Sequence, residues 1–217
     1  MIKMYGFWRS IATFRVRVAM NLKGLPFEEE MIDLLKGEQY APAFRAINPQ
    51  AALPAVIIDG GPVLTQSLAI IEYLEDLHPA PALLPADALG RARVRSIALL
   101  LAADHHPLIT PRIRKFMSES MALSDDQVTT WILHWFREGL VLAEARLAHD
   151  PATGVFCHGD TPTLADICLV GQAVVARGFG IDTAAWPAVH RITDACLAID
   201  AFARAQPMRQ PGAPASH

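Results

Sequence analysis

The composition of the chain is that of a folded protein with a large apolar core. Of its 217 residues, 52% are hydrophobic and 19% are charged, which suffices for one large domain or two small ones and argues against disorder. The net charge is −3, with acidic and basic residues interspersed, and this pattern gives no reason to expect a nucleic-acid partner.

Two features of the sequence bear on its compartment. The longest apolar run, Ile97 to Ala103, is far too short to cross a membrane, and the first residues lack the apolar core of a signal peptide. The three cysteines, Cys157, Cys168 and Cys196, have no CxxC spacing and cannot all pair within the chain. We therefore expect a cytoplasmic protein with reduced thiols and no membrane partner.

The N-terminal part of the chain alternates between strand and helix patterns. Apolar spacing and turn residues predict a strand at 2–7, a helix at 13–22 that stops at Gly24, a strand at 26–34, a helix at 38–47, a strand at 53–58, a hairpin return at 63–64 and a helix at 67–77. This order, βαβ followed by ββα, is that of a thioredoxin-like domain, which we place at residues 1–80.

A proline-rich segment separates this part from an all-helical remainder. Residues 78–87 contain three prolines and are typical of a linker, and strand patterns disappear after them. Helical spacing predicts helices at 91–117, 125–148, 163–176 and 188–199. The predicted fold class is α/β plus all-α, with a C-terminal helical bundle at residues 88–206 and a disordered end at 211–217.

Five segments resemble the motifs of one protein family, in the same order along the chain. Residues 10–19 are similar to the signature S-S-C-S-x-R-V-R-I-A, residues 48–54 to N-P-Q-x-x-V-P, and residues 66–74 match Q-S-L-A-I-I-E-Y-L. Residues 163–166 and 207–211 resemble two further motifs, T-L-A-D and P-x-R-Q-P. On these motifs the chain is identified as a member of the zeta-class glutathione transferases, which include maleylacetoacetate and maleylpyruvate isomerases. The resemblance implies the glutathione transferase fold, glutathione as cofactor and a homodimer.

The resemblance places Ser10 at the catalytic position. In a thioredoxin-like fold, the chemistry lies where the first strand meets the first helix, because unpaired N–H groups and the helix dipole favour an anion there. The stretch from Ser10 to Thr13 contains no cysteine, which excludes disulfide exchange. A serine hydroxyl can donate to a bound thiolate and lower a thiol pKa of about 8.5 toward neutrality. From the residues alone, a helix cap at Ser10 or Thr13 is the simpler interpretation, and the resemblance favours catalysis by Ser10.

Further positions are implied by the resemblance to hold glutathione. Leu53-Pro54 matches a cis-proline turn whose backbone pairs with the cysteinyl part of glutathione, and a trans proline that opens a strand is the alternative. Gln66 and Ser67 open a helix whose N-terminus suits the γ-glutamyl carboxylate, and Ser67 as a simple N-cap is compatible with this. Gln39 falls where the family contacts the glycyl end, with a solvated glutamine as the alternative.

The resemblance also implies a site for a small electrophile or dicarboxylate. Arg9 directly precedes the catalytic position and is expected to face this second substrate. Residues 104–112 resemble the H-P-x-N-N-x-R stretch of maleylpyruvate isomerases. In that stretch, His106 would reach glutathione and Arg112 would bind a substrate carboxylate, for which a planar guanidinium is well suited.

The chain departs from the family pattern at two points in this stretch and at a third near the end of the helix that starts at Thr163. Thr110 stands where asparagine is usual, Pro111 introduces a bend into the expected helix, and a further arginine of the family is displaced to Arg177. The adjacent pair His105 and His106 does not indicate a metal site, since successive helical residues point about 100° apart. We therefore expect no metal.

Several other chemically suggestive residues are interpreted as structural. The spacing of Thr163 and Asp166 predicts a capping box at the start of a helix, not a catalytic acid. The three cysteines are expected to be small core residues. Arg15 and Arg17 lie one turn into the first helix and are expected to form ion pairs.

The reaction implied by the resemblance is a glutathione-dependent cis–trans isomerisation of a maleyl compound. Ser10 would stabilise the thiolate, and Arg9 and Arg112 would orient the dicarboxylate. Two alternatives stay open. Ile11 and Ala12, which replace the serine and cysteine of the signature, make the site more apolar and keep conjugation of small electrophiles open. A carrier that binds glutathione with little turnover is the other alternative.

Overall fold

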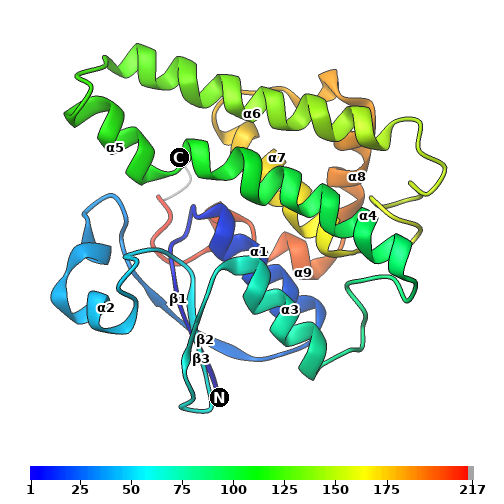
Figure 1. Cartoon of the computed structure of the whole chain (residues 1–217), viewed down its shortest axis with the longest axis horizontal. Helices are drawn as coiled ribbons and strands as arrows, with labels where there is room; N and C mark the ends of the chain where they lie inside the picture. The colour runs from blue at the N-terminus through cyan, green and yellow to red at the C-terminus, as the bar shows by residue number, and fades with distance from the viewer. Residues whose placement is uncertain (215–217) are drawn as a thin grey trace. The chain divides into compact units, whose positions relative to one another are not determined.

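A four-stranded mixed sheet organises the N-terminal part of the chain (Figure 1). The computed structural model describes residues 1–214. The strands, in the order β2-β1-β3-β4, are β1 (Ile2–Gly6), β2 (Phe27–Met31), β3 (Ala55–Ile58) and β4 (Val63–Thr65). β1 is parallel to β2 and antiparallel to β3, and β3 is antiparallel to β4. The sheet therefore has the parallel crossover and the hairpin that the sequence predicts.

Helices flank this sheet. They are α1 (Ile11–Leu22), a 3₁₀ turn (Glu38–Tyr40), α2 (Pro42–Ile47) and α3 (Ser67–Leu77). Successive side chains of a strand point to opposite faces, so Met4 and Tyr5 of β1 serve different layers. Tyr5 makes an edge-on contact with Phe44 of α2, with 5.8 Å between ring centroids, while α1 and α3 pack on each other (Figure 1). Met4 is fully buried.

The expected helix at 38–47 is divided into a 3₁₀ turn and α2. Ala41 between them is extended, with φ −61° and ψ 141°. The physical reason is Pro42, whose ring disfavours helical geometry in the residue before it. The other elements of this part lie within a few residues of their predicted bounds.

The second part of the chain is helical. Its elements are α4 (Ala88–Leu99), a π-helical turn (Leu100–His105), a 3₁₀ turn (His106–Ile109), α5 (Pro111–Glu119), α6 (Asp125–Leu147), α7 (Leu164–Gly178), a 3₁₀ turn (Thr183–Ala185) and α8 (Pro187–Leu197). α7 contacts α4, α6 and α8, and all residues from Leu164 to Ala173 are buried. An apolar helix buried on every side is therefore the centre of this bundle.

The prediction of one continuous helix at 91–117 is wrong. The helix widens to π geometry at Leu100, tightens to 3₁₀ geometry at His106, and begins again as α5 at Pro111. Pro107 and Pro111 lack the N–H that an α-helix needs, and their rings clash with the preceding turn. The stretch that contains His106 and Arg112 therefore lies at a helix break, not in the middle of a helix.

The chain divides by its contacts into two compact units, and the division differs from the predicted one near the C-terminus. Among the described residues, the first unit comprises 1–82 together with 200–214, and the second comprises 83–199. α9 (Asp200–Ala203) and a 3₁₀ turn (Pro207–Arg209) follow the second unit. Asn21 Nδ2 in α1 donates to the Ala201 carbonyl at 3.0 Å, which places residues beyond 200 with the first unit.

Two further findings concern the C-terminal segment and the length of the helices. Of the segment 211–217, which was expected to be disordered, residues 211–214 are described and include Gly212 at φ +82°. Residues 215–217 lie outside the described residues. Within residues 1–214, no helix is both long and apolar enough to span a bilayer.

Candidate active site

The ends of three strands meet at one edge of the sheet. Tyr5 of β1 pairs with Ala55 of β3, and Ala55 pairs with Thr65 of β4. Because β3 is antiparallel to both neighbours, the segment after β1, the segment before β3 and the segment after β4 leave the sheet at this edge. The register thus brings together three segments with predicted site residues, namely 7–10, 53–54 and 66–67.

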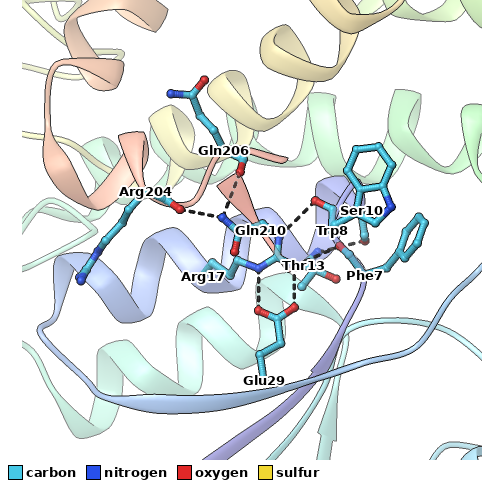
Figure 2. A network of polar contacts seen from close by, with 9 residues as sticks. All are labelled: Phe7, Trp8, Ser10, Thr13, Arg17, Glu29, Arg204, Gln206 and Gln210. Carbon is cyan, nitrogen blue, oxygen red and sulfur yellow. Dashed lines mark hydrogen bonds and ion pairs between the residues drawn. The ribbon is translucent and has the colours of Figure 1, made fainter. Parts of the chain in front are cut away.

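Ser10 is the N-cap of α1. Its Oγ accepts a hydrogen bond from the Thr13 N–H at 3.1 Å, and its own N–H donates to the Phe7 carbonyl at 3.0 Å (Figure 2). A hydroxyl has one proton to donate in addition to its two acceptor lone pairs. No acceptor for that proton is found in the described part of the chain. The cap and a hydrogen bond to a thiolate are therefore compatible at Ser10, whereas Thr13 is fully buried.

The peptide bond between Leu53 and Pro54 is cis, as the resemblance implies. The loop before it is organised by Asn48, which is 2% exposed. Asn48 Nδ2 donates to the Ala52 carbonyl at 2.8 Å, and its Oδ1 accepts from the Gln50 N–H at 3.1 Å. Sequence reasoning assigned no role to Asn48, although an asparagine before a proline is a typical turn former.

Gln66 and Ser67 begin α3, and the interpretation of Ser67 as an N-cap is wrong. The N-cap is Gln66, which has φ 68° and ψ 110° and makes no side-chain capping bond. Ser67 is the first helical residue, and its Oγ accepts from Arg15 Nη1 at 3.1 Å. The first N–H groups of an α-helix have no partner within the helix, so this helix start suits an anion.

Gln39 is buried, which excludes the alternative of a solvated glutamine. Only 5% of the residue is exposed, and it lies in the 3₁₀ turn that precedes α2. Its Oε1 has no hydrogen-bond partner among residues 1–214. A buried amide oxygen without a partner costs free energy, so this atom is suited to receive a donor from a bound molecule.

Arg9 is half-buried beside an aromatic ring. Its guanidinium carbon lies 5.4 Å from the centroid of the Trp8 ring, within the range of a cation–π contact. Burial lowers the pKa of Arg9 from its ordinary value. An arginine remains a cation at neutral pH even so, and a partly desolvated cation attracts a carboxylate more strongly than an exposed one.

His106 and Arg112 belong to the second unit. His106 begins the 3₁₀ turn, and its N–H donates to the Leu101 carbonyl. Arg112 is exposed and is the second residue of α5. The neighbouring His105 is 4% exposed, and its Nδ1 lies 2.7 Å from the Leu100 carbonyl. Among the described residues, no group of three or more His, Cys, Asp or Glu side chains is arranged to hold a metal ion.

Comparison with known proteins identifies the family. The family model of the glutathione S-transferase N-terminal domain matches residues 10–77. The maleylpyruvate isomerase of Ralstonia sp is 44% identical over 210 residues, which cover 97% of this chain and 99% of that protein. A solved holo structure of a maleylpyruvate isomerase, described as a bacterial glutathione transferase of the zeta class, has a TM-score of 0.94 and 44% identity, covering 98% of this chain and 100% of that one. The chain belongs to the zeta-class glutathione transferases.

A second solved structure supports this membership in the zeta class. It is the maleylacetoacetate isomerase from Methylobacterium extorquens AM1 with bound malonate and glutathione. Its TM-score is 0.96 and its identity is 51%, covering 98% of this chain and 100% of that one. The agreement extends over both units, so the fold predicted from the sequence is confirmed.

In this zeta-class chain, the displaced Arg177 is engaged by neighbouring helices of its own unit. Its Nε donates to Thr183 Oγ1 at 2.9 Å, and its Nη2 donates to Asp194 Oδ1 at 2.9 Å. The same Nη2 lies 3.3 Å from His190 Nδ1. The guanidinium therefore joins the end of α7 to α8.

The structural interpretation of Asp166 and of the cysteines is confirmed. Asp166 is fully buried, forms the capping box with Thr163, and also accepts from the Cys157 N–H at 2.7 Å. Burial raises the pKa of its carboxyl. All three cysteines are buried and free. Burial raises the pKa of the Cys157 and Cys196 thiols, so neither is suited to act as a nucleophile.

Proposed function

We propose that this chain is a glutathione-dependent cis–trans isomerase of a maleyl compound, either maleylacetoacetate or maleylpyruvate. The full-length similarity to isomerases of these two substrates supports this proposal. The observation that carries the mechanism is Ser10 at the start of α1, with its hydroxyl proton unused by the described residues. A hydroxyl in this position can donate to a thiolate where the helix dipole also favours negative charge.

The residues at the sheet edge fit glutathione. The unpartnered Oε1 of Gln39 can accept from the glycyl N–H, and the free N–H groups at the start of α3 can bind the γ-glutamyl carboxylate. Leu53 would pair its backbone with the cysteinyl part, and His106 would add a contact from the second unit. Glutathione, once bound, would supply a thiolate as the nucleophile for addition to the activated double bond, and rotation about the resulting single bond would precede release of the thiolate.

The side chains of this enzyme then have distinct roles in the reaction. Ser10 holds the sulfur ionised by donating its hydroxyl proton in a hydrogen bond, which raises the thiolate fraction at neutral pH. Arg9 and Arg112 hold the carboxylates of the maleyl substrate, since a guanidinium matches the planar geometry of a carboxylate. The protein thus binds, orients and stabilises charge, and the nucleophile comes from the bound tripeptide.

A homodimer in the cytoplasm is part of this proposal. Exposed apolar side chains on α4 and α6 support a dimer: Leu99 is 47% exposed, Val141 44% and Leu142 37%. Association of two subunits would remove exposed apolar area of this kind from water. Light scattering coupled to size exclusion measures the mass directly, and a monomer across micromolar concentrations would contradict the dimer. Three buried free thiols agree with a reducing compartment.

The test of the function is turnover of maleylacetoacetate and of maleylpyruvate, followed by absorbance with and without glutathione. Rapid isomerisation that requires glutathione is the expected result. Conjugation of a chlorinated aromatic electrophile without isomerisation would replace this proposal by a general transferase. Binding of glutathione without either reaction would replace it by a carrier.

A further inference from the structure

Arg17 is a buried cation in the middle of α1, and its guanidinium has partners on two sides. Its Nε and Nη2 donate to the two carboxylate oxygens of Glu29 in β2, at 2.7 Å and 2.5 Å. Its Nη2 also donates to the Phe7 carbonyl at 3.1 Å, and its Nη1 approaches the Trp8 carbonyl at 3.5 Å. The planar fork therefore joins a strand, a helix and the turn between β1 and α1 (Figure 2).

The contact with Phe7 connects Arg17 to the catalytic serine. The Phe7 carbonyl accepts from Arg17 Nη2 and also from the Ser10 N–H at 3.0 Å. The Arg17 guanidinium and the Ser10 N–H thus share one acceptor. The Trp8 carbonyl belongs to the residue whose ring lies beside the Arg9 guanidinium. Arg17 therefore fixes the backbone of the turn that carries the side chains of Ser10 and Arg9, the two predicted functional residues of this turn.

The residues around this ion pair leave little room for another arrangement. A Cβ atom added at Gly6 would lie 2.1 Å from Glu29 Oε1 and 2.6 Å from Thr13 Cγ2, so a side chain there would displace Glu29. The side chain of Arg17 is 2% exposed and that of Glu29 is 15% exposed. Buried ions are costly unless every polar atom is matched, and here the fork meets a carboxylate and two carbonyls.

We propose that Arg17 is a positioning residue for the reaction, which sets the place of the Ser10 hydroxyl and of the Arg9 guanidinium through the carbonyls of Phe7 and Trp8. This inference rests on the proposed function, in which Ser10 stabilises the glutathione thiolate. The strength of a hydrogen bond falls steeply with misalignment of its donor. A shift of the turn therefore weakens the bond to the thiolate even when the serine itself is present.

The test replaces Arg17 by lysine, which keeps the charge but loses the planar fork. Lys23 supplies a matched control at the other end of α1, because its Nζ also meets a buried carboxylate and two carbonyls: Glu75 Oε2 at 2.7 Å, His78 O at 2.6 Å and Pro81 O at 3.0 Å. The helical rise puts Lys23 about 20 Å along the axis from Ser10. The Lys23→Met variant should therefore lose stability without disturbing the turn.

The measurement is the pKa of the thiol of bound glutathione, obtained from the ultraviolet absorbance of the thiolate against pH at saturating glutathione. We expect Arg17→Lys to raise this thiol pKa by about half a unit to one unit, whereas Lys23→Met lowers only the unfolding temperature. If Arg17→Lys does not fold, Glu29→Gln takes its place in the test. This variant keeps the shape of the side chain at position 29 and removes one of the two oxygens that accept from Arg17. A smaller rise is expected for that variant.

Two contrary results have different meanings. The first is a thiol pKa that equals that of the wild type in folded Arg17→Lys, or in Glu29→Gln if that variant replaces it. This result overturns the role of Arg17 and leaves the proposed function in place. A wild-type protein that binds glutathione without lowering its thiol pKa contradicts the proposed function itself, and the inference with it.

Discussion

Replacing Ser10 by alanine removes two interactions of different kinds. The first is the capping bond from the Thr13 N–H, whose loss costs about 1 kcal/mol of folding free energy. The second is the hydrogen bond from the hydroxyl to the glutathione thiolate, which belongs to the proposed function. Removing one such donor to a developing anion slows an enzyme by roughly 10²–10³-fold, or about 3–4 kcal/mol. We therefore expect Ser10→Ala to be mildly destabilised and to lose isomerase turnover by at least two orders of magnitude.

Ser124 offers a matched control for the capping contribution. It is the N-cap of α6, where its Oγ accepts from the Gln127 N–H at 3.3 Å within a capping box. The Ser124→Ala variant therefore loses a cap of the same chemistry, again about 1 kcal/mol, without any predicted site residue being changed. Its turnover per folded molecule should equal that of the wild type.

The assay combines urea unfolding with glutathione-dependent isomerisation of maleylpyruvate. Urea unfolding measures the free energy of each variant, and absorbance measures turnover at saturating glutathione. If Ser10→Ala and Ser124→Ala lose similar stability and both retain wild-type turnover, Ser10 is a helix cap and the reasoning from the thiolate is refuted.

Two further predictions concern the second unit. A Cβ atom at Gly139 in α6 would lie 3.1 Å from Cγ of His105, whose Nδ1 lies 2.7 Å from the Leu100 carbonyl and restrains the ring, so Gly139→Ala should cost about 1–3 kcal/mol. Because the proposed function has the adjacent His106 contact glutathione, the variant should also raise the KM for glutathione. Gly178→Ala, with no atom within 4 Å, is its control, and equal unfolding midpoints would argue against crowding. Asp87 caps α4, and the Gly90 N–H lowers the pKa of its carboxyl. Its contribution is fully present above the ordinary pKa of 3.8 and is lost as the pH falls from 3.8 through the lowered pKa of the folded protein. The wild type should therefore lose its stability advantage over Asp87→Asn only below pH 3.8, and a pH-independent difference in melting temperature would contradict this.

The fold was predictable from local signals because its elements are bounded by such signals. Ser10 caps α1, Gly24 adopts a left-handed φ of 64° after it, and Thr163 with Asp166 begins α7. The break in the helix expected at 91–117 was also encoded locally, in Pro107 and in a proline four residues later. The apolar spacing of this stretch predicts a single helix, and that prediction is wrong because the two prolines interrupt the helix.

Other features could not be read from local patterns, because they depend on residues distant in the chain. The hydrogen bond from Asn21 to Ala201 spans 180 positions, and it groups α9 with the first unit. The burial of Gln39 likewise depends on tertiary packing, and a polar residue beside glutamate and tyrosine carries no sequence signal for it. The same holds for Arg17, whose ion pair was expected but whose contacts with the turn were not.

The candidate site follows from the way the sheet directs two helix N-termini to one edge. β1 and β4 both end there because β3 is antiparallel to each, so α1 and α3 begin at the same edge. Each N-terminus carries unpaired N–H groups and a partial positive charge. This edge of the sheet therefore attracts anions although the net charge of the chain is −3, and the thiolate and a carboxylate of one ligand can bind at the two helix N-termini. Neither helix needs a basic side chain in its first turn for this purpose, and the buried Arg15 that donates to Ser67 adds a positive charge behind the second N-terminus.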